Sequence, residues 1–151
     1  MFEKDLMRGH RILVTGGGTG LGRAMSERFL QLGASVAICG RRKAVLDEAA
    51  QQMMREHGGE VKTFAVDIRD AQAVEAMVDE IFAEGPLTGL VNNAAGNFIS
   101  PTEALSSRAF DAIANIVFHG TFYVTNAVGK RWIAAAKAAG GWKPGDPMKS
   151  V

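Results

Sequence analysis

The sequence predicts an α/β fold: a Rossmann-like, doubly wound parallel sheet of four strands with flanking helices and the start of a fifth strand. Short apolar runs of strand length alternate with segments whose apolar residues recur every three or four positions. This alternation is typical of βαβ crossovers, which produce parallel sheets. The strand segments are continuously apolar, as expected where helices cover both faces of a sheet.

Length and composition limit what the chain can be. Its 151 residues are enough for one hydrophobic core, so we treat 1–151 as one domain. The net charge of +1 gives no electrostatic reason to expect nucleic acid or a membrane as a partner. The three histidines are scattered without Cys or acidic neighbours at ligand spacing, so no metal site is expected.

The cellular location is also constrained by composition. The one cysteine, Cys39, excludes an internal disulfide and fits a reducing compartment. Because Cys39 ends an apolar strand, we expect an inert core thiol. The first six residues contain no apolar run of signal-peptide length, and no segment is apolar enough to span a bilayer. We therefore expect a cytoplasmic protein.

The first strand and helix enclose a glycine-rich turn. The strand is predicted to end at Thr15, and the helix is predicted to stop at Gly33 because glycine commonly ends helices. The residues expected on the buried stripe of this helix are Leu21, Ala24, Met25, Phe29 and Leu32.

The turn between them has the composition of a phosphate-binding loop. Gly16, Gly20 and Gly22 follow a Gly-x-x-x-Gly-x-Gly spacing, and Leu21 stands where the alternative Gly-x-Gly-x-x-Gly would have its last glycine. Free backbone N–H groups at the positive end of a helix suit a phosphate, and glycine lets a pyrophosphate approach the backbone. An ordinary strand–helix turn is the alternative, but the flanking strand and helix favour dinucleotide binding.

Two further strand–helix units are predicted. Strands are expected over 35–39 and 61–66, and the helices after them should end at Gly58 and before Pro86, which cannot continue a helix. The three methionines among their apolar positions are expected to be core filler. Those apolar positions are Val45, Leu46, Ala49, Ala50, Met53 and Met54 in the first helix, and Val74, Met77, Val78, Ile81 and Phe82 in the second.

The last part of the chain is predicted to hold a fourth strand over 89–92, a loop over 93–101 and a long helix from Ser106 to Ala139, with Ser106 as its N-cap. A fifth strand is expected to begin at 148–151, after a segment of loop composition. The apolar side of the long helix is predicted to consist of Phe110, Ile113, Val117, Thr121, Val124, Val128 and Trp132.

The residues after the second strand indicate which dinucleotide binds. Arg41 and Arg42 follow that strand, and no acid occurs before Asp47. NAD-selective folds place an acid here to bind the ribose hydroxyls, whereas a guanidinium group matches a 2′-phosphate. A solvated basic start to the helix is the alternative, but cations at a helix N-terminus oppose the dipole. The sequence therefore predicts NADP(H).

Polar residues at the ends of later strands have two interpretations each. Asp67 follows the third strand, at the edge where ligands of open α/β sheets bind, so we favour a ligand contact and leave the helix cap to Asp70. Asn92 and Asn93 could contact a ligand or only satisfy backbone groups of their turn. Phe98 could contact a ligand or fill the core.

The glycine turn from Thr15 to Gly22, combined with Asn92-Asn93-Ala94, resembles the short-chain dehydrogenase/reductase family, and the similarity covers residues 9–139. The stretch 92–103, Asn-Asn-Ala-Ala-Gly-Asn-Phe-Ile-Ser-Pro-Thr-Glu, resembles the 2,4-dienoyl-CoA reductase branch more narrowly.

The resemblance implies an NADP(H)-dependent reductase of an enoyl- or 2,4-dienoyl-CoA thioester, assembled as a homo-oligomer that is a tetramer in the family. It implies that the turn wraps the cofactor pyrophosphate, that Asp67 binds the adenine amino group and that Asn93 lies beside the adenosine ribose. The expected cofactor-binding residues are Gly16, Gly18, Thr19, Gly20, Leu21, Gly22, Arg41, Arg42, Asp67, Ile68, Asn93, Ala94 and Ala95. The positions matched to acyl-CoA contacts are Arg69, Phe98 and Ser106.

The sequence departs from the family pattern at catalytic positions. The family's Tyr-x-x-x-Lys is absent: Tyr123 is followed four residues later by Ala127, and the motif would fall beyond Val151. We therefore expect no catalytic residue in this chain and a truncated, inactive cofactor-binding half. His119 stands near an asparagine of the dienoyl reductases and is either a donor to a substrate carbonyl or an ordinary helical histidine.

Two rival functions follow from these departures. Since fold alone does not set the substrate, a carbonyl or 3-hydroxyacyl reductase of the same fold is one alternative. A non-catalytic dinucleotide-binding protein is the other, should Val151 be the natural end of the chain.

Overall fold

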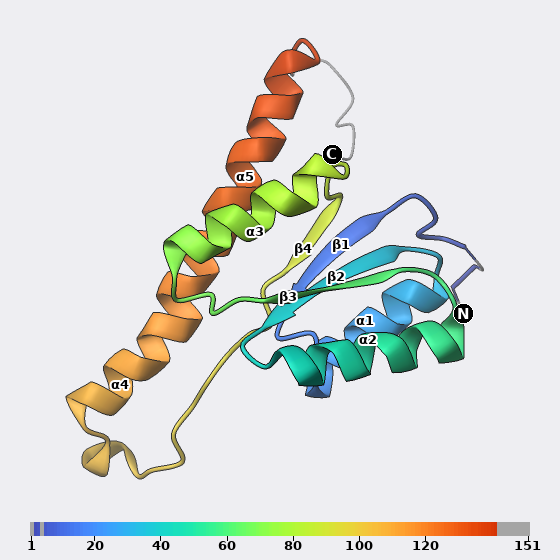
Figure 1. Ribbon diagram of the computed structural model, residues 1–151. Helices are drawn as coiled ribbons and strands as arrows, with labels where there is room; N and C mark the ends of the chain where they lie inside the picture. Colours follow the sequence, from blue (N-terminus) through green and yellow to red (C-terminus); the bar gives the residue numbers. More distant parts are fainter. Residues whose placement is uncertain (1, 4, 142–151) are drawn as a thin grey trace.

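A computed structural model describes residues 2, 3 and 5–141 and places four parallel strands in one sheet, in the order β3-β2-β1-β4 (Figure 1). The predicted α/β class and parallel sheet are confirmed, with strand ends that differ from the prediction by at most one residue. The segment 148–151, expected to begin a fifth strand, lies outside the described residues. The strands are β1 (Arg11–Thr15), β2 (Ser35–Gly40), β3 (Val61–Ala65) and β4 (Gly89–Val91).

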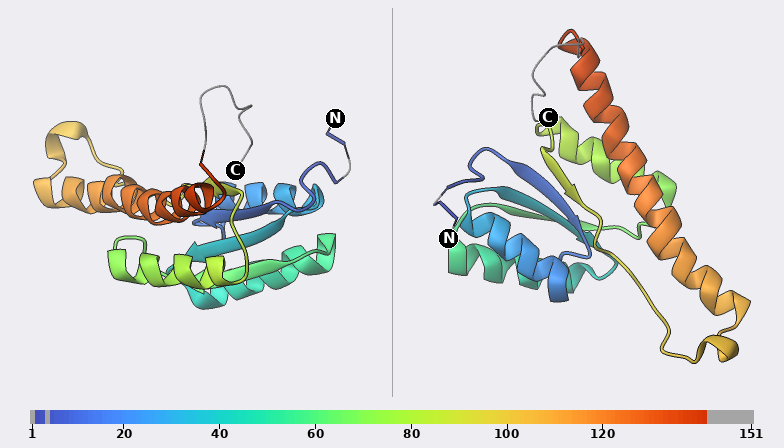
Figure 2. Two further views of the ribbon diagram at one scale, coloured as in Figure 1. Left: turned by 90° about the horizontal axis from the view of Figure 1, so that it is seen from above. Right: turned by 180° about the vertical axis from the view of Figure 1, so that it is seen from behind.

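Helices cover both faces of the sheet, as a doubly wound fold requires. The helices α1 and α2 lie on one face, and α3 and α5 lie on the other (Figure 2). The helical segments are α1 (Gly20–Gln31), α2 (Lys43–His57), α3 (Ala71–Ala83), the 3₁₀ turn η1 (Thr102–Ala104), α4 (Ser107–Ala114), the π-helical η2 (Asn115–Gly120) and α5 (Thr121–Ala138).

The sheet carries a hydrophobic core on each face. Ile12 and Val14 of β1 join the cluster under α1 and α2, whereas Leu13 joins the cluster under α3 and α5. This division follows from the two-residue period of a strand, in which successive side chains point to opposite faces. Because both faces are covered, the interior residues of β1 and β2 are consecutively apolar.

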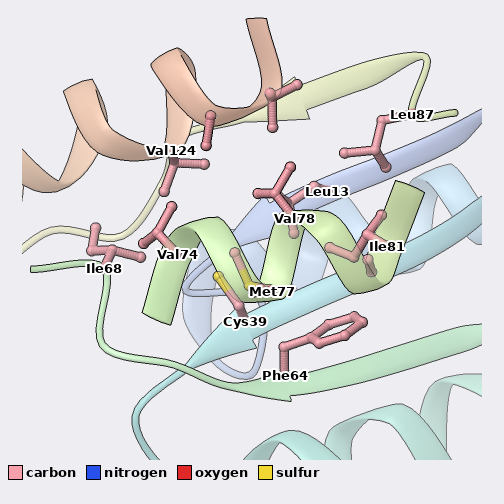
Figure 3. Close-up of a cluster of buried hydrophobic side chains, with 13 residues drawn as sticks. Leu13, Cys39, Phe64, Ile68, Val74, Met77, Val78, Ile81, Leu87 and Val124 are labelled. Carbon is pink, nitrogen blue, oxygen red and sulfur yellow. The ribbon is translucent and has the colours of Figure 1, made fainter. Parts of the chain in front are cut away.

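Cys39 and three methionines, Met53, Met54 and Met77, belong to or pack against these cores. Figure 3 shows Cys39 of β2 and Met77 of α3 side by side in the cluster under α3 and α5. Burial raises the pKa of the Cys39 thiol to about 12, so the expected core thiol is protonated at neutral pH. Met53 and Met77 are buried, and Met54 is half-buried against the cluster under α1 and α2. The prediction that these methionines fill the core is therefore confirmed.

The buried stripe predicted for the first helix is wrong. Leu21 is 78% exposed, and of the predicted stripe only Leu32 is buried. The residues of α1 that face the sheet are Gly22, Ser26 and Leu30. Small residues on this side let the helix approach the strands closely, and the Ser26 hydroxyl is satisfied by donating to the Gly22 carbonyl at 2.8 Å. Close backbone approach, rather than apolar content, selects the buried face.

The predicted long helix is present, but it is interrupted by a π-helical segment. Ser106 caps its start, since the Ser106 hydroxyl accepts from the Ala109 N–H at 3.2 Å. The predicted apolar side is correct only in the second half: Val124 and Val128 are buried, whereas Phe110 is 60% exposed. An extra residue per turn in η2 shifts the phase of the stripe, and α4 lies beyond the edge of the sheet (Figure 1).

Polar contacts attach α5 to the rest of the fold. The Trp132 indole N–H donates to the Leu87 carbonyl at 2.6 Å, and Arg131 pairs with Glu75 at 2.9 Å and with Asp79 of α3. These contacts fix α5 to α3 and to the segment that precedes β4. Neither α5 nor any other helix of the described part of the chain is both long and apolar enough to cross a membrane.

Candidate functional site

The topology creates a crevice at the carboxyl edge of the sheet. From β1 the chain proceeds to β2 and β3 on one side, whereas β4 lies on the other side of β1. Such a switch point is where open α/β sheets bind ligands. A cavity of about 460 Å³ opens at this edge, bounded by segments that follow all four strands.

The predicted cofactor residues meet in this cavity. Every one of them lines it except Gly20 and Gly22, and Arg69 lines it as well. Ile116 of η2 also lines the cavity, and sequence reasoning missed it because an apolar residue in a predicted helix carries no signal of a binding site. Gly120 of the same segment packs so closely on Ile68 that a Cβ at position 120 would overlap the isoleucine side chain.

Glycine is required at different positions of the turn for different physical reasons. Gly16 and Gly20 have φ of +67° and +56°, the left-handed region that favours glycine. Gly22 is required by packing instead, because a Cβ there would overlap the Gly16 carbonyl oxygen and lie 2.5 Å from Asn93 Nδ2. The turn thus brings bare backbone to the cavity just where α1 begins.

The first turn of α1 makes this region electropositive. The first N–H groups of an α-helix have no acceptor within the helix, and the helix dipole is positive at that end. Since α1 starts at Gly20, directly after the turn, these donors lie beside the cavity. A pyrophosphate group fits such an arrangement: side chains do not block its approach, and N–H groups are available to it.

Thr15 links the two loops that border the crevice. Its buried hydroxyl accepts from the Asn93 N–H at 3.0 Å and from the Ala94 N–H at 2.9 Å. In return, the Asn93 side-chain amide donates to the Thr15 carbonyl at 3.0 Å. Asn93 therefore does satisfy backbone groups, and its predicted contact with the ribose stays a prediction. The structural role of Thr15 was missed because it depends on two segments far apart in sequence.

The end of the cavity beyond β2 is basic. Arg41 and Arg42 line it and are exposed. Asp47, the first acid after β2, is already engaged: it pairs with Lys43 Nζ at 2.8 Å and accepts from the Thr63 hydroxyl at 2.6 Å. These hydrogen bonds, with that of Lys43 the strongest, lower the pKa of Asp47. The charged side chains that directly follow β2 and line the cavity are therefore two cations, Arg41 and Arg42.

Asp67 and Asp70 have separate roles in the loop after β3. Asp70 caps α3 by accepting from the N–H groups of Gln72 at 3.0 Å and Ala73 at 3.1 Å, as predicted. Asp67 lines the cavity and is bonded to Arg69. The hydrogen bond from Arg69, helped by the charge of Arg41, lowers the pKa of Asp67, so its carboxylate is ionised at neutral pH.

The residues predicted to contact substrate lie in different places. Phe98 is 55% exposed, which excludes the alternative that it fills the core. Ser106 is engaged as the cap of α4. His119 is exposed on η2, with its ring centroid 6.1 Å from that of Phe118 and 6.3 Å from that of Tyr123. Contacts of these residues with a substrate stay predictions.

Comparison with known proteins identifies the family. The model of the short chain dehydrogenase family matches residues 10–141. The chain belongs to the short-chain dehydrogenase family. The family binds a nicotinamide dinucleotide, which agrees with the glycine turn, the helix N-terminus and the cavity that they border.

Several relatives within this family carry specific names. "Probable 2,4-dienoyl-CoA reductase 3" of Caenorhabditis elegans is 46% identical, over 88% of this chain and 44% of the relative. A "probable 2,4-dienoyl-CoA reductase" of Bacillus subtilis is 37% identical, over 81% of this chain and 48% of the relative. This short-chain dehydrogenase chain therefore spans about half the length of these relatives.

Solved structures of the family show the same fold. A citronellol catabolism dehydrogenase from Pseudomonas aeruginosa PAO1 is 36% identical and superposes with a TM-score of 0.80, over 87% of this chain and 54% of the other. A short chain dehydrogenase from Bacillus anthracis is 39% identical, also with a TM-score of 0.80, over 86% of this chain and 52% of the other.

Proposed function

We propose that the protein is an NADP(H)-dependent short-chain reductase whose dinucleotide site lies in this chain. The observation that carries the proposal is the cavity at the switch point, which joins a glycine turn and helix N-terminus to a pair of arginines after β2. The first of these suits a pyrophosphate, and the second suits a 2′-phosphate. Engagement of Asp47 by Lys43 and Thr63 also favours NADP(H), because it occupies the nearest acid that could bind a ribose hydroxyl.

Each segment of the chain has a distinct part in this proposal. The nicotinamide of the cofactor supplies the hydride when it is bound, and the protein orients it. The turn from Gly16 to Gly22 holds the pyrophosphate, Arg41 and Arg42 hold the 2′-phosphate, and Asp67 accepts from the amino group of adenine. Thr15 and Asn93 keep the two walls of the crevice in register through their mutual hydrogen bonds.

We expect NADPH to bind at least about tenfold more tightly than NADH, because a charge-assisted hydrogen bond contributes about 1.5–3 kcal/mol. Arg41→Asp should shift the preference toward NADH, since the carboxylate repels a phosphate and accepts from ribose hydroxyls. Calorimetric titration of both cofactors measures the ratio. Arg55→Asp is the matched control, because Arg55 is an exposed arginine at the other end of α2. Equal affinities in the unmodified protein would refute the assignment.

We infer that the substrate is an enoyl- or 2,4-dienoyl-CoA thioester. The support is the stretch 92–103 and the relatives named 2,4-dienoyl-CoA reductases. A longer protein that carries this sequence and a Tyr-x-x-x-Lys should oxidise NADPH with a 2,4-dienoyl-CoA and act far less on simple ketones, as followed by the loss of NADPH absorbance. Activity on acetoacetyl-CoA without activity on dienoyl or enoyl thioesters would favour the carbonyl or 3-hydroxyacyl reductase instead.

We also infer a homo-oligomer, tetrameric as in the family. Large apolar side chains are exposed along α4, η2 and α5, where the sheet of the same chain does not cover them. Such a row is typical of a surface that another subunit covers. The exposed apolar residues are Phe110, Val117, Phe118, Phe122 and Ile133.

A cytoplasmic location stays a prediction.

A further inference from the structure

Asp67 and Arg69 form a closed pair at the rim of the cavity. The Arg69 Nε–H lies 2.9 Å from one carboxylate oxygen of Asp67 and 3.0 Å from the other, and Arg69 Nη2 donates to the second oxygen. The backbone N–H of Arg69 donates to the first oxygen at 3.0 Å. Both side chains are partly exposed and line the cavity.

The Asp67 carboxylate remains accessible to a ligand, because its side chain is 32% exposed where it lines the cavity. An ionised carboxylate accepts about four hydrogen bonds through its two oxygens. Three N–H groups of Arg69 make four contacts with these oxygens, because the Nε–H is shared between the two, and the planar guanidinium fixes the plane of the carboxylate. Asp70, rather than Asp67, caps α3, so the N-terminus of α3 does not compete with a ligand for the Asp67 carboxylate.

The surrounding charges favour an ionised acceptor. Arg69 and, at longer range, Arg41 are the cations that lower the pKa of Asp67, while partial burial of the carboxyl group opposes them. A charged acceptor makes a stronger hydrogen bond than a neutral one, provided that it is held in the correct orientation. Arg69 supplies both the charge and the orientation.

We propose that Arg69 is a positioning residue for the cofactor: it holds Asp67 as an oriented, charged acceptor for the amino group of adenine and so sets the preference for adenine over a base without that group. The inference rests on the proposed function, because it takes Asp67 as the adenine contact. It differs from the contact with acyl-CoA that the family resemblance implies for Arg69, since here the guanidinium is already engaged by Asp67.

The test compares two ligands that differ only in the amino group. Adenosine 2′,5′-bisphosphate and purine riboside 2′,5′-bisphosphate carry the same phosphates, so the ratio of their affinities isolates the contact to the base. We expect the wild-type chain to prefer adenine by about tenfold or more. Arg69→Gln should reduce this preference about two- to fivefold, the range expected for a partly exposed ion pair. Arg69→Lys, which keeps the charge, should restore part of it.

A second readout follows Asp67 directly. Titration of its side-chain ¹³C carboxyl signal should show a pKa below the usual value in the wild-type chain and a higher pKa in Arg69→Gln. Arg55→Gln is the control, since this exposed arginine of α2 lies outside the cavity lining and should change neither readout. A purely structural role of Arg69 would lower the affinities for both ligands equally and leave the ratio unchanged.

The outcomes separate this inference from the function on which it rests. If Asp67→Ala abolishes the preference for adenine while Arg69→Gln retains it in full, Arg69 is not the positioning residue and the proposed site stands. If the wild-type chain binds both ligands equally, the contact between Asp67 and adenine is wrong and the inference fails with it. If neither ligand binds, the proposed NADP(H) site is itself overturned.

Discussion

Gly22→Ala is expected to destabilise the chain by about 3 kcal/mol or more and to remove dinucleotide binding. A Cβ at this position would overlap the Gly16 carbonyl oxygen and lie 2.5 Å from Asn93 Nδ2. Relief requires α1 to move away from the turn, but the packing of the buried Leu30 holds α1 on the sheet. Insertion of atoms into such a site typically costs about 1–3 kcal/mol, and contact with backbone leaves little room to adapt.

Urea unfolding and NADPH titration measure the two parts of this prediction. The matched control is Gly129→Ala: Gly129 lies inside α5, where a Cβ meets no atom within 4 Å. Alanine there should stabilise the chain by about 0.5–1 kcal/mol, because glycine is unfavourable within helices. A Gly22→Ala variant that unfolds at the wild-type urea concentration and binds NADPH normally would show that the packing at the turn is looser than the structure indicates.

The 151-residue chain by itself is expected to bind NADPH without reducing an enoyl thioester. Its one tyrosine, Tyr123, packs against the core cluster under α3 and α5 and is followed by Ala127 where the family motif has lysine. The chain thus holds the groups that we propose for the adenosine side of the cofactor, but no Tyr-x-x-x-Lys to donate a proton or hold the nicotinamide ribose. General acid catalysis contributes about 10²–10⁴-fold, and loss of orientation adds to this deficit.

A steady-state assay of purified chain, with its mass verified, checks this prediction. NADPH binding is measured on the same sample, so that a lack of turnover cannot be attributed to a misfolded site. A longer family member that carries the motif serves as the positive control. Turnover by the 151-residue chain at a rate typical of enzymes, about 1–10³ per second, would show that the catalytic residues lie elsewhere, with His119 the first to be substituted.

Local features of the sequence predicted most of the framework. Apolar runs and their spacing located the four strands to within one residue, because burial on both faces leaves an unmistakable pattern. Two helix caps, Asp70 and Ser106, were predicted correctly because a cap involves residues only two or three positions away. The glycine turn and the residues after each strand indicated the site, since parallel strands bring their carboxyl ends to one edge.

Other features depended on contacts between distant segments. The face of α1 that is buried follows from how closely Gly22 approaches Gly16 and Asn93, which apolar periodicity does not encode. The phase shift at η2 exposed Phe110, although the spacing of the long helix is regular in the sequence. Both errors arose where a tertiary contact overrode a local pattern.

The sequence by itself thus determined the order of strands and helices along the chain, the helix caps, the glycine turn and the set of residues at the sheet edge. All of these depend on neighbours in sequence or on where a strand ends. The tertiary structure alone decided which of these residues engage one another. Thr15 holds Asn93 across the crevice, Lys43 and Thr63 occupy Asp47, and Arg69 holds Asp67 at the cavity. These pairings depend on the relative placement of loops from different strands, and only the packed sheet fixes that placement.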